Sequence, residues 1–186
     1  AEGFGTYTYP FTVRGNKDAD LSIVEDGDNK YFKLQHRNKP YTSIDSEVIM
    51  GCIQEYSVYE LSARVFVDSA EPSSIMAKLN FVPEDATEEV PFLYSMLGYC
   101  PESSSDIGWV DCKIPFMFLE KHAKASSIGL GFIVSDEEAV VYYDDLHFTV
   151  VNHPTDTIVV DGEVSECWGV GADILLTSYS MSPDDD

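Results

Sequence analysis

Apolar and polar side chains alternate along most of this chain with a period of two residues, which is the spacing of a half-buried β-strand. The longest such run spans residues 59–67, and the same alternation recurs at residues 75–81, 128–134 and 146–150. The spacing of about 3.6 residues that is typical of a helix is nearly absent. Residues 118–125 fit either a single helical turn or a strand that ends in a loop. The pattern therefore predicts an almost entirely β-stranded chain.

Turn-forming residues separate the predicted strands. They occupy residues 15–16, 26–29, 68–72 and 135–138, which are rich in glycine, asparagine, aspartate and serine. These residue types favour turns because of their backbone freedom or their short polar side chains. The longest irregular region, residues 83–90, is acidic and predicts a surface loop. Many antiparallel strands with this punctuation predict an all-β fold, a two-sheet antiparallel β-sandwich of the jelly-roll type.

The length of the chain predicts one domain and a short extension. A domain of about 150 residues already buries roughly two thirds of its unfolded surface, so 186 residues are too few for two full domains. We expect the β-sandwich to occupy residues 1–150, because the character of the sequence changes at Asn152-His153-Pro154. Residues 151–186 are then a C-terminal extension or the start of a following module, and the last, acidic residues are expected to be disordered.

The chain is strongly acidic, with 33 acidic and 11 basic residues and a formal net charge of -22. This balance argues against nucleic acid as a partner, since affinity for a phosphate backbone depends on clustered lysine and arginine. It also disfavours an anionic membrane surface, and no segment approaches the roughly 20 apolar residues that cross a bilayer. The N-terminus lacks the basic-then-apolar pattern of a secretion signal, as expected of a processed, mature protein. We therefore expect no membrane insertion.

The four cysteines, Cys52, Cys100, Cys112 and Cys167, lack the spacing of a zinc site, because no CxxC pair and no histidine pair accompanies them. An even number of cysteines fits two disulfides, and hence a secreted or extracellular protein. Cys100 and Cys112 flank a polar loop and form the first predicted pair, which leaves Cys52 with Cys167. Other pairings stay open, as do buried free thiols in a cytosolic protein.

Five short motifs, in this order along the chain, resemble a known family. They are residues 13–15 (Val-Arg-Gly) with 19–22 (Ala-Asp-Leu-Ser), residues 29–34 with His36-Arg37 and Tyr41, residues 59–65 (Tyr-Glu-Leu-Ser-Ala-Arg-Val), Trp109, and residues 142–146 (Tyr-Tyr-Asp-Asp-Leu). Together they resemble the carbohydrate-binding modules of families four, nine and twenty-two, which accompany xylanases and β-glucanases and have a galactose-binding-domain-like jelly roll. The resemblance implies a polysaccharide or oligosaccharide as partner, and neighbouring modules in the same polypeptide.

The resemblance also implies three carbohydrate-binding residues. Arg14 matches an arginine that contacts sugar hydroxyls in this family, Tyr41 matches its stacking aromatic residue, and Tyr94 lies near a second aromatic position. An aromatic ring can cover the apolar C–H face of a sugar, and a guanidinium can donate hydrogen bonds to its hydroxyls. Arg14 is alternatively a surface charge paired with an aspartate, and the tyrosines alternatively fill the core or the rim of the sandwich. Trp109 is expected to pack between the sheets.

A structural calcium ion, remote from the sugar-binding face, is a further implication of the resemblance. Asp26 and Asp28 in a predicted turn, and Asp145 at the last strand, supply carboxylates of the kind that calcium binds with about six to eight oxygens. Their spacing differs from that of an EF-hand loop. Asp-Gly turns also occur for conformational reasons alone, so a turn without an ion is the alternative.

No catalytic residues are predicted. The acidic side chains cluster in turns and loops, whereas a glycoside hydrolase needs two carboxyl groups that face each other across the sugar bond. The four histidines have no Gly-x-Ser-x-Gly partner of the kind found in serine hydrolases. The sequence therefore favours a non-catalytic module that recognises a polysaccharide. The alternatives are a structural or adhesive calcium-binding module of a larger secreted protein, and a jelly-roll glycoside hydrolase.

Overall fold

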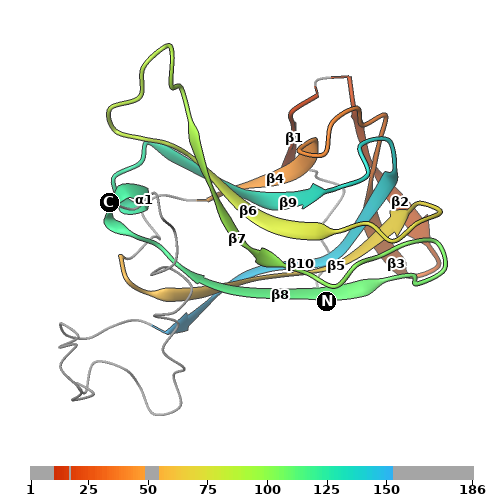
Figure 1. The fold of residues 1–186 in the computed structure, drawn as a ribbon. Helices are drawn as coiled ribbons and strands as arrows, with labels where there is room; N and C mark the ends of the chain where they lie inside the picture. The colour runs from red at the N-terminus through yellow and green to blue at the C-terminus, as the bar shows by residue number, and fades with distance from the viewer. Residues whose placement is uncertain (1–10, 17, 49–54, 153–186) are drawn as a thin grey trace.

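The chain folds into two five-stranded antiparallel β-sheets that lie face to face, as the computed structural model shows (Figure 1). The structure describes residues 11–16, 18–48 and 55–152. Sheet A has the strand order β1-β4-β9-β6-β7, and sheet B has the order β2-β3-β10-β5-β8. The predicted all-β fold, a two-sheet antiparallel sandwich of the jelly-roll type, is confirmed.

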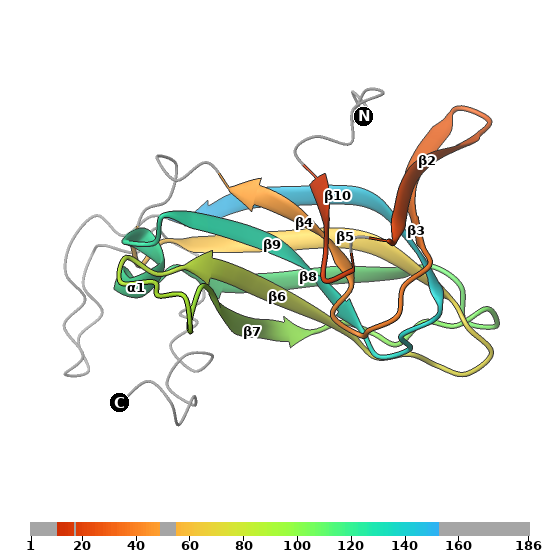
Figure 2. The same cartoon turned by 90° about the horizontal axis from the view of Figure 1, so that it is seen from above.

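The described part of the chain contains ten strands and one short helix. In chain order the elements are β1 (Phe11–Arg14), β2 (Asp20–Asp26), β3 (Asn29–Gln35), β4 (Ser43–Val48), β5 (Val58–Asp68), β6 (Ile75–Val82), β7 (Leu93–Tyr99), β8 (Val110–Met117), α1 (Glu120–Ala123), β9 (Ser127–Val134) and β10 (Val140–Asn152). The single turn of α1 lies where the sequence allowed one. Figure 2 shows that the β2–β3 hairpin extends from the end of the sandwich opposite α1.

The core lies between the two sheets and consists of the alternating apolar residues. In β5, every second side chain from Tyr59 to Val67 is at most 5% exposed. β6 and β9 bury their predicted apolar faces in the same way. In β10 a bulge between Asp144 and His147 interrupts the pairing with β5. Beyond the bulge, Phe148 closes the end of the core by stacking on Tyr59, with 5.1 Å between the ring centroids.

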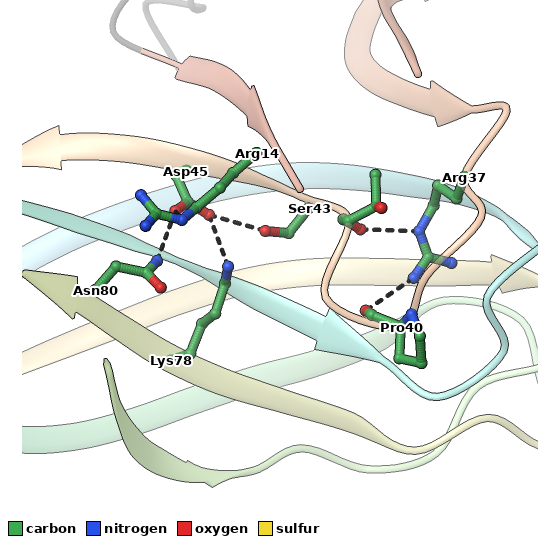
Figure 3. Close-up of polar contacts among 8 residues, drawn as sticks. Arg14, Arg37, Pro40, Ser43, Asp45, Lys78 and Asn80 are labelled. Carbon is green, nitrogen blue, oxygen red and sulfur yellow. Dashed lines mark hydrogen bonds and ion pairs between the residues drawn. The ribbon is translucent and has the colours of Figure 1, made fainter. Parts of the chain in front are cut away.

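Arg37 ties two loops to one end of the sandwich. It is only 4% exposed, and it donates five hydrogen bonds to backbone carbonyl oxygens, two of which are drawn in Figure 3. The accepting residues are Pro40, Thr42, Val134, Asp136 and Ala139. Burial lowers the pKa of Arg37, and nearby Tyr143 and Asp136 offset only part of this shift. The guanidinium thereby holds the β3–β4 connection against the β9–β10 connection.

The prediction that Trp109 packs between the sheets is wrong. Trp109 lies on the outer face of sheet B, where its ring contacts Tyr31 at 5.4 Å and Phe66 at 5.9 Å between centroids. Phe66 points outward, because Val65 and Val67 on either side of it are buried in the core. Tyr31 likewise precedes the buried Phe32 in β3. Val110, which follows Trp109, packs against the core instead. The alternation of β8 therefore turns Trp109 outward.

The predicted C-terminal extension, residues 151–186, lies almost wholly outside the described residues, which end at Asn152. The domain boundary at residue 150 stays a prediction. Within the described ranges, no helix has the length and apolar character needed to span a membrane.

Candidate functional site

The outer face of sheet A carries an open cleft of about 630 Å³. Four of its strands and two adjoining connections contribute side chains to it. The lining residues are Arg14, Gly15, Tyr41, Lys78, Asn80, Phe92, Tyr94, Met96 and Ile133. The cleft faces solvent on the side of the sheet that does not touch the core, because Leu79 between Lys78 and Asn80 is fully buried in that core. A ligand can therefore reach it without any opening of the sandwich.

The three residues expected to bind carbohydrate all line this cleft. Arg14 ends β1, Tyr41 precedes β4, and Tyr94 lies in β7 at the opposite edge of the sheet. The tyrosines are 48% and 64% exposed, and the Arg14 side chain is 36% exposed. Sequence reasoning therefore found three residues that the fold brings together at one accessible surface. Their contact with a sugar stays a prediction.

Asp45 lies beneath the cleft and organises its polar groups (Figure 3). Its carboxylate accepts hydrogen bonds from Asn80 Nδ2 at 2.6 Å and from Ser43 Oγ at 2.8 Å. It also forms ion pairs with Lys78 Nζ at 3.3 Å and with Arg14 Nε at 3.8 Å. Asp45, Lys78 and Asn80 are each at most 5% exposed. The Asp45 cluster, as we call these five residues, thus couples β1, β4 and β6 through one buried carboxylate.

Glycine in β9 makes this cluster possible. β9 lies between β4 and β6, and Gly131 is the register partner of both Asp45 and Lys78. A Cβ atom at Gly131 would lie 2.4 Å from Asp45 Oδ1 and 2.4 Å from the backbone oxygen of Ile44. Two side chains separated by a whole strand can meet only because nothing projects from the strand between them. Gly131 therefore leaves the space in which the Asp45 carboxylate reaches Lys78.

The cluster contains two cations and one anion. The pKa of Lys78 is lowered overall, and burial is the main cause. The neighbouring Asp45 carboxylate opposes this shift, and the positive charge of Arg14 adds to it. Lys78 is buried beside the Asp45 carboxylate, whereas the Arg14 side chain is 36% exposed and lines the cleft. A buried charge is tolerated when it is paired and hydrogen-bonded. The excess of positive charge at the bottom of the cleft therefore faces its open side.

Two aromatic residues fix the position of Arg14 and of the rim beside it. The Arg14 guanidinium lies over the Phe92 ring, with 4.5 Å from Cζ to the ring centroid. Gly15 adopts a φ of +93°, and a Cβ atom there would lie 3.0 Å from the Tyr41 ring. Glycine adopts positive φ without strain, so Gly15 allows Tyr41 to pack beside Arg14. Phe92 approaches from the β6–β7 connection and so links the two edges of sheet A across the cleft.

Sequence reasoning missed Asp45, Lys78, Asn80, Phe92 and Met96 as members of this site. Lys78 and Asn80 did carry a signal, since two polar residues alternate with strongly apolar ones inside β6. Asp45 had no comparable signal, because three of its four partners, Arg14, Lys78 and Asn80, are 31 to 35 residues away along the chain. The remaining local signal is the pair Gly129 and Gly131 in β9, because glycine in a strand often marks a close approach by another group, which here is the Asp45 side chain.

The residues expected to bind calcium lie near the β2–β3 turn and the β10 bulge. Asp26 ends β2, Asp28 lies in the turn, and Asp145 adopts a φ of 48° in the bulge. Asn29 at the start of β3 donates a hydrogen bond to Asp144 Oδ2 at 2.9 Å, so the turn and the bulge are neighbours. Among the described residues, no three His, Cys, Asp or Glu side chains form a group that could hold a metal ion. Calcium binding at Asp26, Asp28 and Asp145 stays a prediction.

The predicted Cys100–Cys112 disulfide is not present, since both residues are free thiols. The fold does bring them together, because the chain returns after β7 and places Cys112 in β8 beside Cys100. A hydrogen bond with Cys100 and then burial raise the pKa of the Cys112 thiol. Proximity alone, which the flanked loop predicted, does not require a covalent bond. Cys52 and Cys167 lie outside the described residues.

Comparison with known proteins identifies the fold. No protein-family model matches the sequence, and no curated protein matches it. Among solved structures, the CBM22-2 xylan-binding domain of Paenibacillus barcinonensis Xyn10C has a TM-score of 0.63 at 16% identity, covering 80% of this chain and 93% of that domain. The CBM22-1 xylan-binding domain of the same protein has a TM-score of 0.59 at 15% identity, covering 76% and 85%.

A third similar structure contains a bound oligosaccharide and a second kind of module. It is the CBM22-1–GH10 portion of Clostridium thermocellum xylanase Xyn10B in complex with xylohexaose, with a TM-score of 0.61 at 14% identity, covering 75% of this chain and 26% of that chain. At these identities the likeness shows that the chain shares its fold with these modules.

Proposed function

We propose that this chain is a non-catalytic carbohydrate-binding module that holds a polysaccharide in the cleft on sheet A. One observation carries the proposal. Arg14, Tyr41 and Tyr94, which come from three separate segments, line a single open cleft on the outer face of a rigid sheet. A sandwich with its sugar-binding residues scattered or buried would not support it.

The chemistry of the cleft matches the two kinds of surface that a sugar presents. Exposed tyrosine rings at Tyr41 and Tyr94 can cover the C–H face of a pyranose. Arg14 and Asn80 supply hydrogen-bond groups for hydroxyls at the bottom of the cleft. The volume of about 630 Å³ is within the usual range of sites for small molecules, roughly 300 to 1,000 Å³. Several sugar units of a chain can therefore lie across the sheet.

The absence of a suitable carboxyl pair supports binding rather than hydrolysis. Most glycoside hydrolases use two carboxyl groups that flank the scissile bond. None of the nine residues that line the cleft is an aspartate or a glutamate. Asp45 beneath them is 5% exposed and is already engaged by Ser43, Lys78 and Asn80. A general acid and a base are thus missing from the described cleft.

Xylan is the first glycan to test, because the similarly folded domains of Paenibacillus barcinonensis Xyn10C are described as xylan-binding. One of the similar structures holds two such modules in tandem, and another joins the module to GH10. We accordingly propose that this chain acts beside other modules of a secreted polypeptide, where binding keeps the partner module close to an insoluble substrate.

Affinity gel electrophoresis with soluble xylan, mixed-linkage β-glucan or mannan in the gel tests the proposal. We expect one of these polymers to retard the protein, and Tyr41→Ala to reduce the retardation. Covering one ring face removes about 50 Å² of apolar surface from water, which at about 25 cal/mol per Å² corresponds to roughly a tenfold change in affinity. Tyr94→Ala is expected to act in the same direction.

Tyr56→Ala is the matched control, because Tyr56 and Tyr41 are both 48% exposed and Tyr56 does not line the cleft. It should leave the retardation unchanged. If no polymer in the panel slows the wild-type chain, or if Tyr41→Ala and Tyr56→Ala behave alike, the proposed function or its site is wrong. Release of reducing sugar from the polymer that binds would contradict the non-catalytic assignment.

A further inference from the structure

We propose that the glycan bound in this cleft carries a carboxylate, in the form of an isolated uronic acid unit, and that Arg14 binds it. The proposal rests on the proposed function, since it names the ligand chemistry of the same cleft. Three observations support the proposal. They are the net positive charge of the cleft, the unused hydrogen-bond donors of Arg14, and the fixed orientation of its guanidinium group.

The cleft has the opposite charge to the chain as a whole. The chain has a net charge of -22, yet the charged residues that line the cleft are Arg14 and Lys78, both cations. Asp45 beneath them compensates one of the two. One positive charge therefore remains at a site that is partly shielded from water, where electrostatic interactions are stronger than at an open surface.

Arg14 is the cation with capacity to spare. Asp45 is satisfied mainly by Asn80 at 2.6 Å, Ser43 at 2.8 Å and Lys78 at 3.3 Å. Arg14 is the most distant partner and uses only Nε, at 3.8 Å. Neither terminal amino group of Arg14 makes a hydrogen bond or an ion pair with any residue in the described ranges. These two groups form the fork that pairs with both oxygens of a carboxylate.

The guanidinium is also held in place before a ligand arrives. Asp45 restrains Nε, and the Phe92 ring lies against the guanidinium plane at 4.5 Å. Cation–π stacking and an ion pair together restrict a side chain that otherwise loses much rotamer freedom on binding. Preorganisation of this kind favours planar, two-point recognition of a carboxylate over a single contact with a hydroxyl.

The surroundings of the cleft restrict the proposal to isolated carboxylates. The β6–β7 connection, which delivers Phe92 to the cleft, carries four exposed acidic side chains. They are Glu84, Asp85, Glu88 and Glu89. A polymer with a carboxylate on every unit would bring many charges within the Debye length of about 8 Å at physiological salt and be repelled. A mostly neutral chain with a single uronic acid places its one charge beside Arg14 and avoids this repulsion.

Isothermal titration calorimetry with a matched pair of probes tests the proposal. The first probe is a xylo-oligosaccharide that carries one glucuronic acid branch, and the second is the same molecule after reduction of the carboxylate to a hydroxymethyl group. Hydrogen bonds to charged groups are stronger than neutral ones, and we expect roughly tenfold tighter binding of the carboxylate form. The difference should shrink as salt is raised from about 0.05 to 0.5 M, because the Debye length falls.

Three variants assign the effect to Arg14. Arg14→Gln should bind the two probes equally, and Arg14→Lys, which keeps the charge but loses the fork, should retain part of the difference. Arg64→Gln is the matched control, since Arg64 also combines an aspartate partner, Asp111 at 3.6 Å, with an aromatic ring, Trp109 at 5.5 Å, but lies on sheet B. It should preserve the full difference. Circular dichroism and melting temperature confirm that each variant is folded.

The outcomes separate this inference from the proposed function. Equal affinity of the wild-type chain for both probes would overturn the inference and leave carbohydrate binding intact. A sulfated oligosaccharide that binds as tightly as the carboxylated one would show recognition of charge alone, and the assignment to uronic acid would be wrong. If neither probe binds, the inference fails, while retardation by another polysaccharide in the gel panel still decides the proposed function.

Discussion

One methyl group in β9 is expected to decide whether the Asp45 cluster can form. Gly129 and Gly131 lie two residues apart in β9, so a side chain at either position would point to the same outer face of sheet A. A Cβ atom at Gly131 would lie 2.4 Å from both Asp45 Oδ1 and the backbone oxygen of Ile44, whereas the nearest atom to one at Gly129 is 3.5 Å away. Gly131→Ala must therefore displace the carboxylate or separate β4 from β9. Gly129→Ala makes only ordinary contacts.

The cost of Gly131→Ala follows from what the displaced carboxylate leaves behind. Lys78 is 3% exposed, so its amine would stay buried without the ionic partner that now lies 3.3 Å away. Breaking a buried ion pair by removing one partner costs about 3 to 5 kcal/mol. At about 3 °C per kcal/mol for a domain of this size, the melting temperature should fall by about 10 °C. Gly129→Ala should change the stability by less than about 1 kcal/mol.

Urea denaturation followed by tryptophan fluorescence, together with thermal melting followed by circular dichroism, measures both variants. A third variant, Gly131→Ala combined with Asp45→Ala, separates the two clashes. Its added cost over Asp45→Ala alone should be smaller than the cost in the wild-type chain, because only the contact with the Ile44 oxygen remains. Equal stability of the two single alanine variants would refute the argument that Gly131 makes room for the cluster.

Three further predictions concern residues outside the cluster. Arg37→Met should lower the free energy of unfolding by about 3 kcal/mol or more in urea denaturation, because five backbone carbonyl oxygens lose their donor; a change below about 1 kcal/mol would contradict the role of Arg37. Burial raises the pKa of Tyr143, so its contribution is complete below the unfolded pKa of about 10 and is lost as the pH rises toward the folded pKa. Tyr143→Phe should therefore flatten the fall in stability between about pH 9 and 11, and an unchanged slope would contradict this origin. If calcium binds at Asp26, Asp28 and Asp145, it should stabilise the fold and so raise the melting temperature. The stabilisation is about 2.7 kcal/mol when the free calcium concentration is 100 times the dissociation constant. Identical melting temperatures in calcium and in chelator would contradict calcium binding.

The strand pattern was predictable because burial and strand geometry share one period. A residue whose neighbours face the core must itself face outward, so alternation identified the core faces of β5, β6 and β9 before the sheets were known. The same rule explains the error at Trp109, which lies next to Val110, a residue that packs against the core. The motif placed the tryptophan at the start of a strand, and the register of that strand decided its face.

The binding residues divide in a similar way. Arg14 and Tyr41 belong to local motifs. Glycine is needed at position 15, next to Arg14, because the backbone there has a positive φ and the Tyr41 ring lies close to it. A local motif can be recognised in the sequence, because its residues lie close together along the chain. The Cys100–Cys112 pair shows the limit of this reasoning, since the loop brought the thiols together without joining them.

By itself the sequence determined the β-sandwich and its core faces, because the alternation of apolar and polar residues depends on neighbours within a few positions. The resemblance to a known family added three residues that line the cleft, Arg14, Tyr41 and Tyr94. Only the tertiary structure decided that Asp45 meets Lys78 above Gly131, because β4, β9 and β6 are adjacent in sheet A but far apart along the chain. The positive charge of the cleft in an acidic protein arises from that strand order. It is a property of four neighbouring strands, because Arg14 comes from β1, and no single strand of the sequence contains it.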